Sequence, residues 1–265
     1  MDGRKLVLVT GANTGLGFQT VKAICGSDKG YEVLVGGRSI EKAEQAFKDL
    51  KNQFPTSHLH AIQVDIEDDA SIISAFEYVK AKYGKLDALI NNAGAQLDQQ
   101  LTDGKMTARG MWNRTYDVNV TGTHILTWNF GPLLLESSDP RLMFIASGTS
   151  SLAGTENPDF PANKQASKGW PKTLNNFHLP AYRSSKTAMN MMMREWFRLL
   201  GHDGVKVWAI SPGYLATGLG VGHEQNKTQG AIDPAIGAAV VKDVLEGARD
   251  KDVGRVVSKQ GIQAW

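Results

Sequence analysis

Two side chains that could exchange a proton with a bound molecule stand four residues apart in the segment 179–198. This segment reads LPAYRSSKTAMNMMMREWFR, and Pro180 is followed by eighteen residues without glycine or proline. Such a run predicts a helix that begins near Ala181, on which Tyr182 and Lys186 share a face. A nearby ammonium favours the phenolate and lowers the pKa of a phenol, so Tyr182 could give a proton to a carbonyl oxygen or take one from an alcohol. Alternatively, the tyrosine packs against a neighbour and the lysine points into water, because this spacing is common on helices by chance.

The composition fits one large α/β domain. The chain has 265 residues, a formal net charge of +2 from 29 basic and 27 acidic side chains, and one cysteine, Cys25. A nearly balanced charge gives no reason to expect a nucleic-acid or membrane partner. A lone cysteine excludes an intrachain disulfide and argues against a Cys-based metal site, and we expect no metal. The chain shows no signal-peptide pattern and no apolar run of the ~20 residues that span a bilayer, so we expect a cytoplasmic protein.

Short apolar runs alternate with helical patterns along the whole chain. We interpret residues 5–10, 32–36, 59–63, 88–90, 142–147 and 205–211 as strands, with a short last strand ending near residue 257. Helical patterns cover residues 15–24, 40–54, 111–137 and stretches that begin near 69, 181 and 233. Strands separated by helices form parallel sheets. We therefore expect a single-domain, Rossmann-like, doubly wound parallel sheet of about seven strands over residues 1–265, with helices on both faces.

A glycine-rich turn joins the first predicted strand to the first helix. Residues 10–17 read TGANTGLG. Glycine permits a tight turn and lets a pyrophosphate approach the free N–H groups at a helix start. The spacing differs from the common G-x-G-x-x-G, and such turns also occur without a ligand, but the position after the first strand of a βαβ unit favours a dinucleotide. The expected cofactor contacts in this turn are Gly11, Asn13, Thr14, Gly15, Leu16 and Gly17.

The end of the second strand indicates which dinucleotide is preferred. An acidic residue normally holds a free ribose 2′-hydroxyl there, whereas this chain has Gly37 followed by Arg38. A guanidinium pairs well with a 2′-phosphate, so we predict NADP(H) in preference to NAD(H). In the alternative interpretation, Arg38 only begins a loop and stays in water.

Two later strand ends add polar groups at the same edge of the sheet. Asp65 follows the third strand, where it could accept a hydrogen bond from the adenine amino group or cap the helix that begins near Asp69. The fourth strand runs into Asn92, Ala93 and Gly94, whose small side chains and amide suit a backbone packed against a cofactor ribose.

These motifs and their order resemble the short-chain dehydrogenase/reductase family over residues 5 to about 220. The matching segments are the glycine turn, Asn91-Asn92-Ala93-Gly94, Asn119 in YDVNV, Ser147 at the end of LMFIAS, Tyr182-x-x-x-Lys186, and Pro212-Gly213 with Thr217. The surroundings of Trp196 and the segments 207–213 and 263–265 are similar to reductases common in filamentous fungi. A role in secondary metabolism is therefore one expectation.

The resemblance implies a role for each matching residue. It makes Tyr182 the general acid/base and Ser147 the group that holds the substrate oxygen. Lys186 binds the nicotinamide ribose beside Tyr182, and both count as cofactor contacts. Asn119 holds a water in a proton relay, although inside the helix 111–137 it could instead be a packing polar residue. The implied contacts to the nicotinamide carboxamide and its surroundings are Pro212, Gly213, Leu215 and Thr217.

The chain departs from the family pattern between Ser147 and Tyr182, which are 35 residues apart instead of much closer. The extra segment, about 154–177, is rich in Pro, Asn, Lys and Gly and is interpreted as a loop or lid over the substrate. Ser150 and Ser151 remain alternatives to Ser147. The candidate substrate contacts are Phe160, Trp170, His178 and, from the later loop, Tyr214.

The helix that begins near residue 181 carries apolar side chains that are usually core: Met189, Met191, Met192, Met193, Trp196 and Phe197. In the resembled family this helix and the one with Asn119 often form a subunit interface, which implies a homodimer or homotetramer. The leading function is NADPH-dependent interconversion of a ketone or aldehyde and the alcohol. The alternatives are a non-catalytic NADP(H)-binding regulator or scaffold, and a lyase, isomerase or dehalogenase on the same fold.

Overall fold

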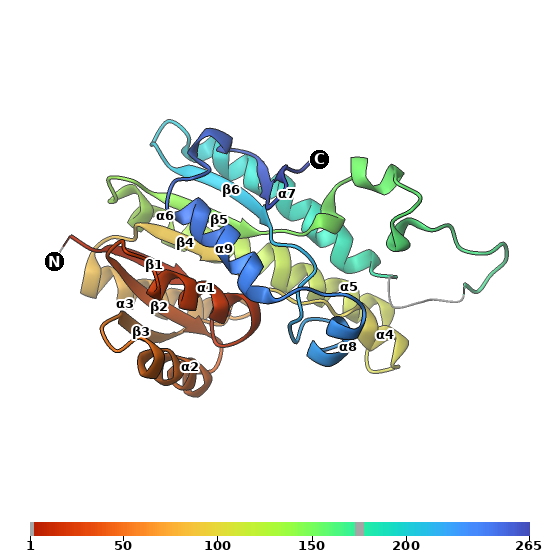
Figure 1. Ribbon diagram of the computed structural model, residues 1–265, viewed down its shortest axis with the longest axis horizontal. Coiled ribbons are helices and arrows are strands. Elements are labelled where there is room, and N and C mark those ends of the chain that lie inside the picture. The colour runs from red at the N-terminus through yellow and green to blue at the C-terminus, as the bar shows by residue number, and fades with distance from the viewer. Residues whose placement is uncertain (1–2, 173–177) are drawn as a thin grey trace.

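The computed structural model describes residues 3–172 and 178–265 and confirms the expected α/β architecture (Figure 1). Within those ranges one eight-stranded sheet has the order β3-β2-β1-β4-β5-β6-β7-β8. Seven strands run parallel, and the two-residue β8 pairs antiparallel with β7. The strands are β1 (Lys5–Val9), β2 (Tyr31–Gly37), β3 (His58–Gln63), β4 (Ala88–Asn91), β5 (Arg141–Ile145), β6 (Lys206–Ser211), β7 (Val256–Ser258) and β8 (Gly261–Ile262).

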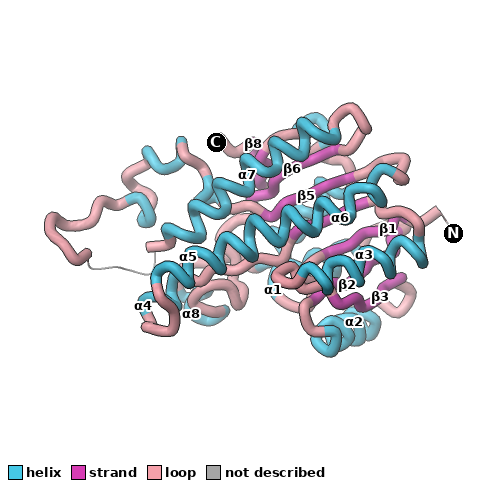
Figure 2. The backbone as a smooth tube through the Cα atoms, turned by 180° about the vertical axis from the view of Figure 1, so that it is seen from behind, coloured by secondary structure: helices cyan, strands magenta, loops and turns pink. Residues whose placement is uncertain are grey.

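Helices cover both faces of this sheet (Figure 2). One face is covered by α1 (Gly15–Cys25), α2 (Ile40–Gln53) and α9 (Pro234–Leu245), and the other by α3 (Asp69–Tyr83), α6 (Thr123–Leu135) and α7 (Pro180–Leu200). Alternate residues of β1 illustrate why the strands are apolar throughout: Leu8 packs with α3 and α6, whereas Val9 packs with α1. The shorter helices are α4 (Asp98–Thr102), α5 (Ala108–Tyr116) and α8 (His223–Thr228).

The long helix expected over residues 111–137 is divided in the structure. It begins at Ala108 as α5, passes through a π-helical turn (Asp117–Gly122) and continues as α6, so that α5 and α6 form one interrupted rod (Figure 2). Gly122 lies so close to the Ile66 carbonyl oxygen that a Cβ would collide with it. The π turn contains Asn119 and replaces the regular i→i−4 hydrogen-bond ladder there.

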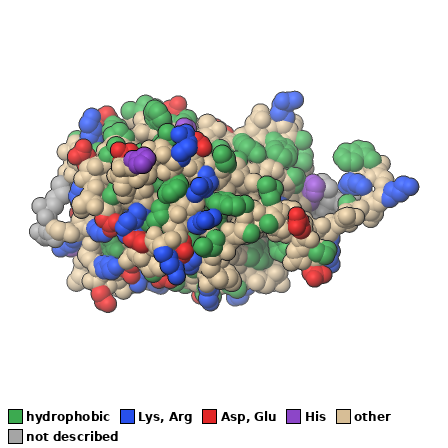
Figure 3. All heavy atoms as spheres, turned by 90° about the horizontal axis from the view of Figure 1, so that it is seen from above, with side chains coloured by type: hydrophobic (Ala, Val, Ile, Leu, Met, Phe, Trp, Pro, Cys, Tyr) green, Lys and Arg blue, Asp and Glu red, His purple; other side chains and the backbone are tan. Residues whose placement is uncertain are grey.

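The segment that separates Ser147 from Tyr182 projects away from the sheet. Its described part up to residue 172 has three short 3₁₀ turns (Gly148–Ser150, Ala153–Glu156 and Pro161–Asn163) and stands out from the body as an arm (Figure 3). Trp170 is 87% exposed and Phe160 is 39% exposed, so the unliganded chain does not fold these two candidate substrate contacts over the sheet edge. The remainder of the predicted lid, 173–177, lies outside the described residues.

Membrane spans and metal clusters are both missing from the described part of the chain. None of its helices combines the length and apolar character that a membrane span needs. It brings together no group of three or more His, Cys, Asp or Glu side chains that could hold a metal ion.

Candidate active site

The first turn of α7 is held by a carboxylate from a distant part of the chain. Leu179 at the N-cap makes no side-chain capping bond. Instead, Asp98 at the start of α4 accepts hydrogen bonds from the backbone N–H groups of Ala181 (2.9 Å) and Tyr182 (3.1 Å). A carboxylate suits these free N–H groups and the positive end of the helix dipole. Asp98 therefore fixes the backbone beneath Tyr182, a role that the sequence did not reveal because 83 residues separate Asp98 from Ala181.

Lys186 lies beside Tyr182 in a buried position, as the four-residue spacing predicts. Its Nζ is 5.8 Å from the centre of the Tyr182 ring and donates a hydrogen bond to the Ile145 carbonyl at 2.7 Å. Burial disfavours the ammonium and lowers the pKa of Lys186 to about 8. The lysine is therefore not a surface side chain, and the alternative in which it points into water is wrong.

The pKa of Tyr182 is raised rather than lowered in the unliganded chain. Burial raises it most, a hydrogen bond with the Ser147 side chain lowers it, and the nearby Asp98 carboxylate raises it further. Removing the phenolate from water thus outweighs the groups that would stabilise it. The expectation that Lys186 brings the pKa of Tyr182 down does not hold for this state.

Ser147 is the serine that lies next to Tyr182. It lies two residues after the end of β5, hydrogen bonding by its side chain lowers the pKa of Tyr182, and its Oγ lies 2.9 Å from Thr149 Oγ1. The two alternatives are occupied elsewhere: Ser150 Oγ donates to the Ser147 carbonyl at 2.6 Å, and Ser151 Oγ donates to the Trp265 carbonyl at 3.2 Å. The geometry therefore favours Ser147 as the group that meets a substrate oxygen.

Asn119 is fully buried and links three parts of the site. Its Nδ2 donates to the Ala95 carbonyl (2.8 Å) and to Ser185 Oγ (2.9 Å), and its Oδ1 accepts from the Ala95 N–H (2.8 Å). A Cβ added at Gly94 would stand 3.1 Å from Asn119 Oδ1 and 3.4 Å from Lys186 Nζ, so Asn119 and the lysine meet at this glycine. These bonds match the packing role that the sequence left open, and the water relay stays a prediction.

The glycine turn forms a cradle at the start of α1. Gly11 and Gly15 have positive φ angles of 60° and 56°, and the N-cap residue Thr14 makes no side-chain capping bond. The first N–H groups of α1 therefore have no side-chain cap, which fits the pyrophosphate of a dinucleotide. Gly17 lies so close to the Gly11 carbonyl that a Cβ would collide there, and Leu16 packs partly buried against the core.

The Asn92 side chain braces this turn. Its Nδ2 donates to the carbonyls of Thr10 (2.8 Å) and Gly11 (3.2 Å), while Thr10 Oγ1 accepts from the backbone N–H groups of Asn92 (3.0 Å) and Ala93 (2.9 Å). The segment after β4 is thereby joined to the turn after β1. Asn92 thus contributes to the cofactor cradle through the shape of the turn.

Arg38 and Asp65 lie at the outer edge of the cradle. The Arg38 side chain is 70% exposed, and its Nη1 is 4.0 Å from Glu67 Oε2, a carboxylate that also pairs with Arg114 at 2.9 Å. Asp65 Oδ1 accepts from the Glu67 N–H at 3.0 Å. The capping alternative for Asp65 is wrong, because Asp68 caps α3 through the Ala70 N–H.

The loop after β6 packs against the glycine turn. A Cβ added at Gly15 would lie 3.4 Å from Thr217 Cβ, and Gly213 has a positive φ of 101° that lets the chain turn. Leu215 forms an isolated β-bridge with Ile232, and both Leu215 and the residue after it, Ala216, are buried. The predicted loop residues 212–217 therefore lie at the carboxyl edge of the sheet together with the turn.

Two further substrate candidates have structural contacts. The Tyr214 hydroxyl donates to Asn226 Oδ1 at 3.0 Å and to Gln229 Oε1 at 3.2 Å, which ties the loop after β6 to α8. His178 is exposed and lies near the Asp98 carboxylate, whose pKa is raised by burial.

Comparisons with known proteins agree with this geometry. The family model described as short chain dehydrogenase matches residues 5–178 and 173–228. The short-chain dehydrogenase/reductase eupG of a Phoma species is 44% identical over 98% of this chain and 97% of its own length. The short-chain dehydrogenase/reductase tropE of Talaromyces stipitatus is also 44% identical, over the same shares of the two chains.

Solved structures share the fold. The NADPH-bound carbonyl reductase from chicken fatty liver superposes with a TM-score of 0.78 over 99% of both chains at 23% identity. A Brucella melitensis structure described as ribose-5-phosphate isomerase gives a TM-score of 0.72 at 22% identity, over 96% of this chain and 90% of its own. At such identities the likeness concerns the fold alone. The family model and the fungal relatives carry the assignment, and this chain belongs to the short-chain dehydrogenase/reductase family of oxidoreductases.

Proposed function

We propose that this protein reduces a ketone or aldehyde to the alcohol with NADPH, or catalyses the reverse oxidation. The observation that carries the proposal is the position of two groups beside Tyr182: the Ser147 hydroxyl, which lowers the pKa of the phenol, and the Lys186 Nζ, which is 5.8 Å from the centre of the ring. A carbonyl oxygen placed between the two hydroxyls would accept a proton from Tyr182 while Ser147 donates a hydrogen bond to the developing negative charge. The nicotinamide, when bound, supplies the hydride.

The pKa directions support proton donation by Tyr182. Because its pKa is raised in the unliganded protein, the phenol holds its proton throughout the neutral range. Lys186, with a pKa of about 8, is mostly charged at pH 7 and can stabilise the phenolate that forms as the proton leaves. The pair therefore suits a reaction in which the tyrosine is the acid in one direction and the base in the other.

The preference for NADPH rests on the side chains at the end of β2. Gly37 has no side chain to occupy the space beside Asn13 Oδ1, and the exposed Arg38 guanidinium can turn toward a 2′-phosphate. Glu67 is the acid that faces Arg38, and part of its charge is already paired with Arg114. The name of the chicken fatty liver structure, an NADPH-bound carbonyl reductase, supports the same cofactor and substrate class.

Tyr182→Phe tests the proposal directly. The rate is measured with a panel of ketones and aldehydes. We expect kcat of the variant to be about 10²- to 10⁴-fold lower than kcat of the wild type, because the variant lacks the proton donor. NADPH binding, followed by cofactor fluorescence, should stay within a few-fold, and the control Tyr78→Phe, at an exposed tyrosine on α3, should keep most of the activity. The ratio of kcat/KM for NADPH over NADH in the wild type measures the cofactor preference.

Two outcomes contradict the proposal. Turnover that survives in Tyr182→Phe removes the tyrosine as the acid. Tight NADPH binding by a wild type that consumes no cofactor across the panel favours the regulator or scaffold instead.

A further inference from the structure

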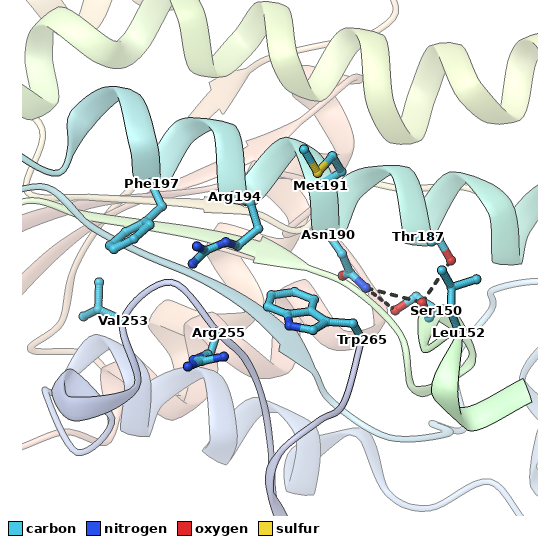
Figure 4. A pocket seen from close by; sticks show the side chains of 10 residues that line it. All are labelled: Ser150, Leu152, Thr187, Asn190, Met191, Arg194, Phe197, Val253, Arg255 and Trp265. Carbon is cyan, nitrogen blue, oxygen red and sulfur yellow. Dashed lines mark hydrogen bonds between the residues drawn. The ribbon is translucent and has the colours of Figure 1, made fainter. Parts of the chain in front are cut away.

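A second cavity lies along α7, beginning at Thr187 and extending past Arg194 toward the C-terminal end of the helix (Figure 4). Its volume is about 580 Å³, within the range of small-molecule sites. The walls come from the later turns of α7, the short turn after β5, the segment that leads into β7, and Trp265. The lining contains none of the residues placed in the active site above.

Two arginines in this cavity lack a carboxylate partner among the described residues. Arg194 Nη1 donates to the Gly254 carbonyl at 2.7 Å, and its guanidinium lies 5.0 Å from the Phe197 ring and 5.9 Å from the Trp265 ring. The Arg255 residue is exposed, and its side chain has no hydrogen-bond or ion-pair partner within residues 3–172 and 178–265. Two guanidiniums without an acid at the edge of an apolar cavity favour an anion with an apolar body.

The cavity also holds a buried acceptor that has no donor. Asn190 is 4% exposed; its Nδ2 donates to Ser150 Oγ at 3.0 Å, and its Oδ1 has no hydrogen-bond partner within the described chain. Figure 4 shows the nitrogen turned to Ser150 and the oxygen on the side of Trp265. Leaving a buried oxygen unpaired is unfavourable. Asn190 Oδ1 is shielded as the side chain stands, so a ligand hydroxyl would satisfy it when the amide turns toward the cavity.

We propose that this cavity binds an aromatic carboxylate that carries a hydroxyl group. The carboxylate would pair with Arg255 and Arg194, and the ring would pack against Trp265 and Phe197. The hydroxyl would donate to Asn190 Oδ1. Each part of this ligand therefore has its own partner in the cavity wall: the arginines for the carboxylate, the aromatic side chains for the ring, and the Asn190 oxygen for the hydroxyl.

The experiment titrates 4-hydroxyphenylacetate into the wild-type protein in an isothermal calorimeter and compares two charge-matched variants. Arg255→Gln removes a cavity guanidinium whose side chain holds nothing else in place. Arg109→Gln removes an exposed arginine on α5, outside the cavity lining, and serves as the control. Thermal melting of both variants checks that they are folded.

We expect saturable binding to one site, with Kd about tenfold or more higher in Arg255→Gln and unchanged in Arg109→Gln, because a charge-assisted hydrogen bond is lost only in the first. In the wild type, the neutral 4-hydroxyphenylacetamide should bind about tenfold more weakly than the acid. Phenylacetate, which lacks the hydroxyl, should bind several-fold more weakly.

Any of three results overturns the proposal. The first is no saturable binding, which is also the result if a second copy of the chain covers the cavity. The second is equal affinity in the two arginine variants, which places the probe elsewhere, including the active site. The third is equal affinity for the acid and the amide, which removes the arginines as the recognition element.

Discussion

Asp98 acts on Tyr182 in two ways that oppose each other. Its carboxylate holds the backbone N–H groups at the start of α7, which fixes where the phenol points. Its negative charge also raises the pKa of Tyr182, which makes the phenol a weaker acid. We therefore regard Asp98 as a positioning residue whose charge also tunes the proton donor.

Asp98→Asn separates these two effects. The amide oxygen can still accept a bond from α7, but the charge is gone, so the pKa of Tyr182 should fall. Reduction needs a protonated phenol, so the rate is full at low pH and is lost as the pH rises through that pKa. The alkaline limb of kcat/KM for carbonyl reduction should therefore move to lower pH, measured as a pH profile at saturating NADPH.

The control for this prediction is Asp98→Ala, which removes the helix cap as well. It should also lower the free energy of unfolding by about 0.5–2 kcal/mol. If Asp98→Asn stays active and its alkaline limb stays at the wild-type pH, the Asp98 charge does not affect the pKa of Tyr182.

Lys186 should leave a signature in the pH dependence of stability. Its pKa is about 8 in the folded chain, against the ordinary lysine value of 10.5 expected in the unfolded chain. Between these values the unfolded chain binds more protons, so the free energy of unfolding should rise with pH. The pKa of Lys186 differs by about 2.5 units between the two states, which corresponds to a gain of roughly 3 kcal/mol in the free energy of unfolding once the pH exceeds both values.

Comparing the wild type with Lys186→Met isolates this contribution from other titrating groups. Urea unfolding from pH 7.5 to about 10.5, without cofactor, should show the wild type gaining stability relative to the variant as the pH rises. A constant difference between the two proteins over this range would mean that Lys186 keeps its ordinary pKa when buried.

At the scale of elements, the turn after β1 and the segment after β4 form one unit. Asn92 bonds the carbonyls of Thr10 and Gly11, and a Cβ at Gly17 would collide with the Gly11 carbonyl and approach the Asn92 amide. The start of α1 can therefore pack against the Gly11 carbonyl and the Asn92 amide only because Gly17 has no side chain. This contact links helix packing to the shape of the pyrophosphate cradle.

Gly17→Ala should therefore impair cofactor binding. We expect the Kd for NADPH to rise by about tenfold or more and the free energy of unfolding to fall by about 1–3 kcal/mol, because the turn must move to admit the methyl group. Gly131→Ala, in α6, is the matched control. A Cβ added at Gly131 would meet no atom within 4 Å. Fluorescence titration with NADPH and urea unfolding measure both effects, and equal behaviour of the two variants would contradict this account.

Helix α7 carries two separate sets of functional groups. Tyr182 and Lys186 lie in its first two turns, and Asn190 and Arg194, in later turns, line the second cavity. Ser150 lies between them, since its Oγ donates to the Ser147 carbonyl and accepts from Asn190 Nδ2. Ser150 and Asn190 thus connect the cavity to Ser147 through hydrogen bonds.

At the scale of the whole molecule, α6 and α7 leave large apolar side chains in water. Trp128 is 65% exposed, and its ring lies 6.3 Å from that of Trp196 across the two helices. Leu135 and Leu199 are 47% and 48% exposed on the same two helices. Exposed apolar surface of this kind on neighbouring helices is typical of a subunit interface, so we expect a homodimer or homotetramer that uses this face.

Trp128→Glu should dissociate that assembly. The wild type should sediment as at least twice the 28.8 kDa chain, and the variant should shift toward the single chain, because a charge would be buried at the interface. Ile73→Glu on α3, where Ile73 is 51% exposed, is the control and should leave the mass unchanged. A wild type that sediments only as a single chain would remove the interface.

The sequence predicted the alternation of strands and helices, and the structure confirms it, because strands buried on both faces are continuously apolar and long helices show a clear periodicity. The division of the helix around Asn119 was not predicted, because the π turn ends at Gly122, which packs against the Ile66 carbonyl from a distant part of the chain. The Tyr182 and Lys186 pairing needed only a helix, and local spacing fixes which side chains of a helix are neighbours.

By itself the sequence determined the fold class, the glycine turn and the four-residue spacing of Tyr182 and Lys186, because these depend on neighbours along the chain. Only the tertiary structure decided that Asp98 holds the first turn of α7, that Asn92 braces the glycine turn, and that Asn190 and Arg194 line a second cavity. It also decided the direction of the Tyr182 pKa. Burial and long-range contacts depend on residues far apart in the chain, and the cost of removing a charge from water is set by everything packed around it.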